Sequence, residues 1–99
     1  MSIVVHKYKL NMAGITELQM PEGAEILSVS SQYDGIVLWA EHTVFETPLM
    51  ENRKFFCAST GHVYDFSKYD DYWFVGTVQM GAVSGYFVAH VYEVVELSS

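Results

Sequence analysis

The chain has 99 residues, of which 51% are hydrophobic and 15% aromatic, and its formal net charge is −7. A single domain of this length buries roughly two-thirds of its unfolded surface, and so apolar a composition excludes a disordered chain. The acidic excess excludes nonspecific binding of DNA or RNA, which depends on cationic neutralisation of phosphates, and it favours a basic partner. We therefore expect one folded domain over residues 1–99.

The first half of the chain is predicted to form four β-strands. Along residues 3–10 apolar and polar side chains alternate, as they do in a half-buried strand. A second strand follows at 15–20, and a turn then leads into a hairpin whose arms are 26–33 and 36–44. Asp34 and Gly35 lie between these arms and suit the positive φ angles that a type I′ hairpin turn requires.

The second half is predicted to add three strands, at residues 53–59, 72–80 and 86–94. A loop at 45–52 precedes them, and the polar and aromatic connection at 60–71 contains at most one helical turn near 65–72. The last two strands pair around the glycine-containing segment 81–85. Both are apolar on both faces, so we expect this hairpin to be central or covered on each side.

No stretch shows the sustained apolar stripe of an amphipathic helix. The sequence therefore predicts a mainly β, single-domain fold: a twisted antiparallel sheet or a small sandwich of about six or seven strands. A strongly apolar sheet without a covering helix can also pack against a second copy of itself. For that reason we predict a homodimer.

Cys57 is the only cysteine, which excludes an internal disulfide and a zinc site rich in thiolates. It lies in an apolar strand, where we expect a small buried side chain. The N-terminus lacks the apolar core of a signal peptide, and no apolar run approaches the roughly 18 residues of a membrane span. By elimination we predict a cytoplasmic protein that has no membrane partner.

The candidate binding turn is Thr60-Gly61-His62, at the end of the fifth strand. Glycine lets the backbone turn with exposed amides, threonine supplies a hydroxyl, and histidine is chargeable near neutral pH. With Arg53 and Lys54 upstream, such a turn suits a phosphate or a carboxylate. The alternative is a strand-ending turn in which His62 caps backbone groups, since the pattern matches no glycine-rich phosphate fingerprint.

Aromatic residues gather in or beside the connection that follows this turn: Tyr64, Phe66, Tyr69, Tyr72 and Trp73. Tyrosine and tryptophan combine apolar area with a polar tip and are favoured at interfaces and around flat ligands. These rings either form an exposed recognition surface or close the open end of the sheet. We include Tyr64 and the strand residue Trp39 among the candidate partner contacts.

The other polar residues form no recognisable catalytic or metal-binding motif. His6, His42 and His90 fall on separate predicted strands, and we expect His90 to be a hydrogen-bonded core histidine. No serine lies in a Gly-x-Ser-x-Gly elbow, and the carboxylates flank loops as solvated surface charges do. We predict no catalytic residue, no metal site and no cofactor.

Five short segments occur in this order: PEGAEILSV at 21–29, LWA at 38–40, TGH at 60–62, VGTVQ at 75–79 and FVAHVYE at 87–93. In their order and spacing the chain resembles a family of small uncharacterised proteins found mainly in bacteriophages and prophages. That family has no established activity, so the resemblance implies no catalytic residue. It implies a phage setting, in which a short acidic domain is often an accessory protein that disables a host component.

Three hypotheses follow. In the first, the protein is non-catalytic and neutralises a host antiviral defence by capturing a host protein or a small nucleotide signal; its few cations would leave backbone amides to bind the nucleotide's phosphates. In the second, it is a small hydrolase acting on a phosphorylated or nucleotide substrate, with His62 as general acid or base beside a second catalytic group. In the third, it is a structural module whose sheet edges mediate oligomerisation.

Overall fold

Seven antiparallel β-strands in two sheets make up the computed structural model, which describes residues 1–32, 35–82 and 85–96. The strands are β1 (Ile3–Leu10), β2 (Gly14–Pro21), β3 (Glu25–Gln32), β4 (Gly35–Thr43), β5 (Met50–Ser59), β6 (Tyr69–Ala82) and β7 (Gly85–Glu96). The described ranges contain no helix, and hence none long and apolar enough to cross a membrane. The prediction of a mainly β domain with about seven strands is confirmed.

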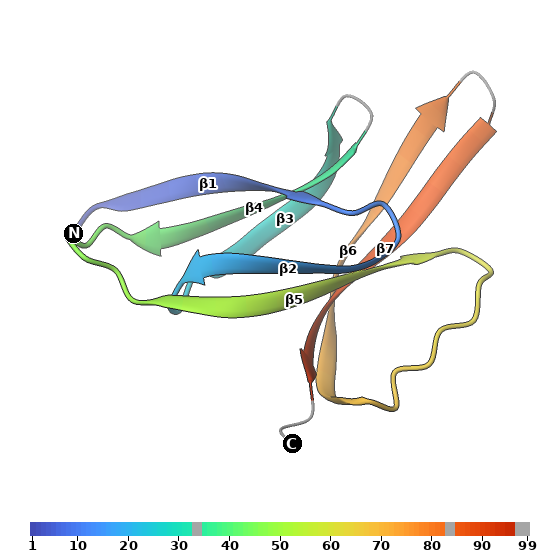
Figure 1. The fold of residues 1–99 in the computed structure, drawn as a ribbon. Helices are drawn as coiled ribbons and strands as arrows, with labels where there is room; N and C mark the ends of the chain where they lie inside the picture. Colours follow the sequence, from blue (N-terminus) through green and yellow to red (C-terminus); the bar gives the residue numbers. More distant parts are fainter. Residues whose placement is uncertain (33–34, 83–84, 97–99) are drawn as a thin grey trace.

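The strands are ordered β1-β4-β3 in one sheet, here called sheet A, and β2-β5-β7-β6 in the other, sheet B. Figure 1 shows β1 and β4 drawn above β2 and β5, with the long β6–β7 hairpin running away from them. The register of β3 and β4 ends at Gln32↔Gly35, which confirms the predicted hairpin. The expected turn residue Asp34 and the middle of the 81–85 turn lie outside the described residues.

The core lies between the two sheets and draws on both. Sheet A contributes Leu10, Ile36, Leu38 and Ala40, and sheet B contributes Met20, Phe55, Cys57, Val78, Ala89 and Val91. Each large apolar side chain buried in this way stabilises the fold by roughly 1.5–3 kcal/mol. The apolar face that was expected to pack against a second copy of the chain is thus covered by the other sheet of the same chain. The homodimer stays a prediction.

Strand β3 of sheet A packs against strand β6 of sheet B. A Cβ atom on Gly76 would lie 2.8 Å from Cγ2 of Val29, so only glycine fits there without a shift. The register of β6 also shifts between Phe74 and Gly76, where a bulge interrupts its pairing with β7. Gly76 therefore lets the long strand β6 pack against the edge of sheet A.

Two sequence expectations need correction. Strand β6 is an edge strand of sheet B, and Phe74 on it is 56% exposed, so the last hairpin is not central or covered on every side. Strand β5 begins at Met50, because its pairing with β2 continues to Met50↔Pro21. The connection from β5 to β6 agrees with the prediction of at most one helical turn, because it has no helix and ends in a reverse turn in which Tyr69 N donates to Phe66 O at 3.0 Å.

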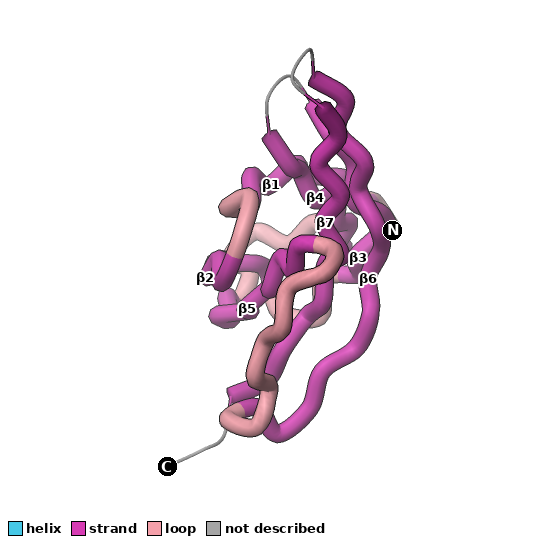
Figure 2. Tube along the Cα trace, turned by 90° about the vertical axis from the view of Figure 1, so that its right-hand side faces the viewer, coloured by secondary structure: helices cyan, strands magenta, loops and turns pink. Residues whose placement is uncertain are grey.

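The connection between β5 and β6 folds back over sheet B. In Figure 2 its pink tube crosses in front of the strands of that sheet. Phe66 from this connection packs edge to face against Phe56 of β5 and Tyr92 of β7, at centroid distances of 5.0 and 5.6 Å. The face of sheet B that points away from the core is therefore partly covered by a loop.

Candidate functional site

A cleft of about 450 Å³ opens on the outer face of sheet B, between the strands and the connection that folds over them. One wall is the turn at residues 59–62, and the other walls are aromatic rings. The predicted site residues Thr60, Gly61, His62 and Tyr64 all line it. The structure therefore brings together four of the seven residues that the sequence singled out.

The turn at one wall has a fixed backbone. Gly61 has a φ of +86°, a left-handed backbone conformation that residues other than glycine rarely adopt. His62 N donates to Ser59 O at 3.3 Å, and Thr60 N donates to Val88 O at 3.2 Å. These bonds tie the turn to itself and to β7, so the cleft has a preformed polar wall.

Thr60 and Thr77 hold the imidazole of His90 between them. Oγ1 of Thr60 lies 2.7 Å from Nε2, and Oγ1 of Thr77 lies 3.0 Å from Nδ1. A neutral imidazole has one donor and one acceptor nitrogen, so one hydroxyl donates to the ring while the other accepts from it. His90 is hydrogen-bonded as expected, but it is half-buried on the outer face instead of lying in the core.

Three rings form a corner at the other wall of the cleft. The centroids of Phe66 and Tyr72 are 5.1 Å apart at 73°, those of Phe66 and Tyr92 are 5.6 Å apart at 86°, and those of Tyr72 and Tyr92 are 6.1 Å apart at 70°. All three pairs have the edge-to-face geometry that aromatic rings prefer. Tyr72 remains 53% exposed, so the rings both cover the sheet and present a surface to solvent.

Tyr64 connects the turn to the rings. Its hydroxyl accepts a hydrogen bond from Ser59 N at 3.2 Å, and its ring packs edge to face on Phe56 at 4.9 Å. His62 is exposed and stacks on Tyr64 with centroids 6.3 Å apart. Within residues 1–32, 35–82 and 85–96, no side chain hydrogen-bonds to the His62 ring, so the hydrolase hypothesis lacks its second group there.

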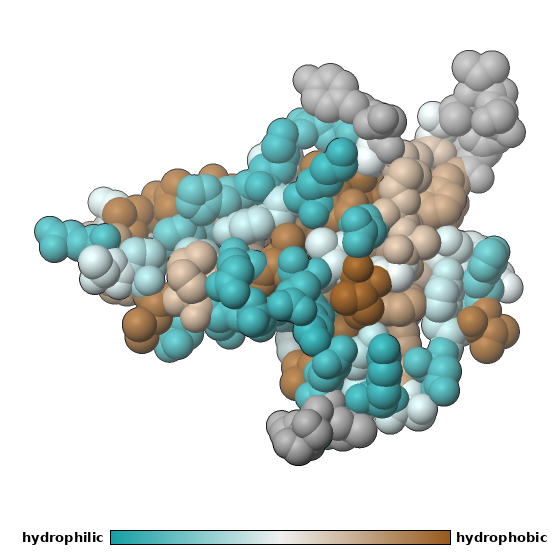
Figure 3. Space-filling view, viewed as in Figure 1, coloured by the Kyte–Doolittle hydropathy of each residue, from teal (hydrophilic) through white to brown (hydrophobic). Residues whose placement is uncertain are grey.

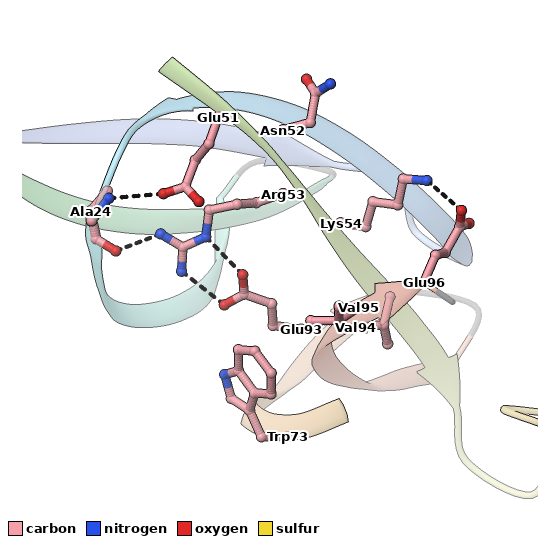
Figure 4. A pocket seen from close by; sticks show the side chains of 11 residues that line it. Ala24, Glu51, Asn52, Arg53, Lys54, Trp73, Glu93, Val94, Val95 and Glu96 are labelled. Carbon is pink, nitrogen blue, oxygen red and sulfur yellow. Dashed lines mark hydrogen bonds and ion pairs between the residues drawn. The ribbon is translucent and has the colours of Figure 1, made fainter. Parts of the chain in front are cut away.

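Arg53 lies at the far end of β5 from the cleft, about 23 Å from Thr60 at the rise of an extended strand. Its Nε and Nη2 atoms donate to the Glu93 carboxylate at 2.7 and 2.8 Å, and Nη1 donates to Ala24 O at 2.5 Å. The hydrogen bonds with Glu93 raise the pKa of Arg53 above its usual value. Figure 4 shows the guanidinium closed in by these partners.

Lys54 is also engaged away from the cleft. Its Nζ lies 2.8 Å from a Glu96 carboxylate oxygen, as Figure 4 shows. The hydrogen bond with Glu96 raises the pKa of Lys54, and the same bond lowers that of Glu96. The hollow of about 530 Å³ around these ion pairs is separate from the predicted turn, so the structure does not bring either cation to Thr60.

Trp39 lies on the other sheet. On β4 it points away from the core side of Leu38 and Ala40, its Nε1 donates to Ser30 Oγ at 3.1 Å, and Lys7 Nζ lies 5.9 Å from its ring centroid. These contacts are local to the outer face of sheet A. Trp39 therefore does not belong to the cleft.

A comparison with protein families places the chain. The sequence model of a family described as a domain of unknown function, DUF7352, matches residues 1–98. The chain belongs to the DUF7352 family. Searches of curated proteins and of solved structures gave no match.

In this DUF7352 protein, sequence reasoning missed His90 and Tyr92, which line the cleft, and Thr77, which hydrogen-bonds to His90. His90 and Thr77 lie beside each other in sheet B, because the register pairs Ala58 with His90 and His90 with Thr77. Alternation along each predicted strand was visible in the sequence, but the register that aligns three strands was not. Among the described residues, no three His, Cys, Asp or Glu side chains gather as metal ligands would.

Proposed function

We propose that this protein is a non-catalytic binding protein that captures its partner in the cleft on the outer face of sheet B. The observation that supports this most is the convergence of the Thr60–His62 turn with the rings of Phe66, Tyr72 and Tyr92 around one open cleft. Interface cores are enriched in such aromatic residues, and hydroxyl groups at their edges give them orientation.

A protein partner fits this cleft better than a nucleotide. A multiply charged phosphate needs cationic side chains or several free backbone amides. No lysine or arginine lines the described cleft, and both Arg53 and Lys54 are held in ion pairs elsewhere. Two amides of the turn, those of Thr60 and His62, already donate to backbone carbonyls.

We further propose that the partner is a component of a host antiviral defence. The support is the resemblance to bacteriophage proteins, together with the short length and the net charge of −7, which suit an accessory protein that acts by stoichiometric capture. In this proposal the protein holds its target and leaves it chemically unchanged.

Co-purification from bacterial cells tests the proposal. The tagged chain is compared with Tyr72→Ala, which removes one wall of the cleft, and with Phe45→Ala, which removes a ring of similar exposure elsewhere. We expect a protein that the parent and Phe45→Ala retain and Tyr72→Ala loses. Retention by both variants, retention by none, or release of a nucleotide from denatured protein would contradict it.

Hydrolysis is the second candidate function, and one observation favours it. The 2.7 Å contact between Thr60 Oγ1 and His90 Nε2 is within the reach of a nucleophile and its general base, and Thr77 orients the other ring nitrogen. In this version His90 replaces His62 as the base. Turnover of phosphate or ester substrates that Thr60→Val and His90→Gln both abolish would establish it.

A further inference from the structure

We infer that the feature of the partner recognised in this cleft is an arginine side chain. The inference deepens the proposed function and rests on it, since it concerns what the same cleft holds. It follows from three independent properties of the cleft: the arrangement of its rings, the charge around it and the acceptors at its edge.

The rings of Phe66, Tyr72 and Tyr92 have the arrangement of a cation site. Their planes are mutually steep, at 70–86°, so they form the corner of a box and not a stack. Because their centroids lie 5.1–6.1 Å apart, one cation above the corner can be within about 6 Å of all three. A cation at that distance is attracted by the electron-rich face of an aromatic ring.

The charges near the cleft complement a cation. Asp65 precedes Phe66, and Asp70 and Asp71 precede Tyr72, whereas the same connection carries one lysine, Lys68. The hydrogen bonds that Ser67 makes to Asp65 lower the pKa of that carboxyl, so it stays ionised. The chain has a net charge of −7, and no lysine or arginine is part of the described lining. Lys68 lies outside that lining, with its Nζ 5.3 Å from the ring centroid of Tyr69.

The edge of the cleft offers acceptors that suit arginine better than lysine. A guanidinium is planar, stacks on aromatic faces and directs five N–H donors outward in its plane, whereas an ammonium is compact and strongly hydrated. The Thr60 hydroxyl is fixed by His90, and its oxygen keeps a lone pair for a donor from the partner. Tyr72 and Tyr92, whose phenol oxygens are also acceptors, line the same cleft.

Titration with a capped amino acid tests this inference without knowledge of the partner. The probes are N-acetylarginine amide and its neutral isostere N-acetylcitrulline amide, followed by NMR shifts of the tyrosine and phenylalanine ring protons. We expect the arginine probe to bind about tenfold more tightly, as a partly desolvated cation–π contact predicts. The preference should persist at 0.5 M salt, a condition of the assay under which attraction to the net charge alone is screened.

Matched variants locate the site. Tyr72→Leu keeps most of the side-chain volume but removes a ring face, and we expect it to abolish the arginine preference. Phe45→Leu makes the same kind of change at a ring that is 61% exposed outside the cleft, and it should leave the preference intact. N-acetyllysine amide should bind more weakly than the arginine probe.

Several results would overturn the inference, and they separate it from the proposed function. Equal binding of the citrulline probe at the cleft would remove the role of the charge but leave the cleft as a binding site. Equal binding of the lysine probe would remove the selectivity for arginine. Absence of any shift, or shifts that follow protein concentration because a second copy fills the cleft, would also overturn it. The proposed function is judged separately, by the co-purification experiment with Tyr72→Ala and Phe45→Ala.

Discussion

Replacing Glu93 by glutamine tests whether Arg53 is a structural residue or a ligand contact. The two side chains are only 15% and 6% exposed and are joined by two hydrogen bonds of 2.7 and 2.8 Å. Removing one charge of such a buried pair typically costs about 3–5 kcal/mol, because the other charge is left uncompensated. Since glutamine keeps one acceptor and Ala24 O keeps another, we expect the lower end, about 3 kcal/mol.

For a domain of about this size, a loss of that order corresponds to a fall in Tm of about 12–24 °C. Urea unfolding followed by tryptophan fluorescence measures it, because Trp73 lines the same hollow as Arg53 and Glu93. The double variant Arg53→Met, Glu93→Leu should regain most of the stability, as apolar replacement of a buried pair often does. The control, Lys54→Gln, removes an ion pair that is more exposed, at 26% and 43%, and should hardly move the midpoint. A loss of less than about 0.5 kcal/mol in the free energy of unfolding of Glu93→Gln would refute this reasoning. It would mean that Arg53 does not depend on Glu93 and is available to bind an anionic ligand.

Three further predictions concern the packing of the fold. Gly76→Ala should lower the free energy of unfolding by about 1–3 kcal/mol, because the new Cβ would clash with Val29. The control Gly35→Ala should lower it less, because its new Cβ would meet only Lys9 Cε, at 3.5 Å. The urea midpoints of the two variants measure the difference. Cys57 is fully buried, and burial raises its pKa to about 11, so a thiol reagent at pH 8 should modify it only after unfolding, and rapid native labelling would contradict this. Light scattering should give twice the 11.2 kDa chain mass if the dimer predicted from the sequence forms, and a mass of 11.2 kDa would rule it out.

The strands and their buried faces were predictable because the signal is local. On β4 the alternation places Ile36, Leu38 and Ala40 on one face, and these residues are 0–1% exposed. Cys57 follows the same logic on β5. A period of two residues is sufficient to separate the faces of a strand, whichever strands later become its neighbours.

The position of β6 was not predictable in this way. The outer face of β6 carries aromatic rings such as Tyr72, which packs on Phe66, and Phe74, which packs on Tyr92. Phe66 lies in the connection between β5 and β6 and not in a strand. An apolar face covered by a loop gives the same sequence pattern as one covered by a second sheet. The pattern therefore favoured a central hairpin, whereas the structure has an edge strand.

The site was predictable where its residues are neighbours in the chain, and not where they meet by register. Thr60 and Tyr64 fall on one cleft because a short connection holds them together. Arg53 is only seven residues from Thr60, yet an extended strand carries it to the other end of the sheet. His90 joins Thr60 only through the pairing of β7 with β5.

Hydrophobic residues are not confined to one part of the surface (Figure 3). On the face drawn there, hydrophobic residues appear in several places, including the end near the N-terminus. Phe45 and Leu49 of the β4–β5 connection are 61% and 72% exposed. Exposed apolar residues alone therefore do not distinguish the cleft from other parts of the surface.

The most direct test is site-specific photo-cross-linking in bacterial cells. A photoreactive phenylalanine analogue is placed at position 72, in the cleft, or at position 45, outside it. The cleft account predicts one discrete cross-linked protein from position 72, competed by added arginine probe, and none from position 45. The same product from position 45 alone, or no product from position 72, would contradict it.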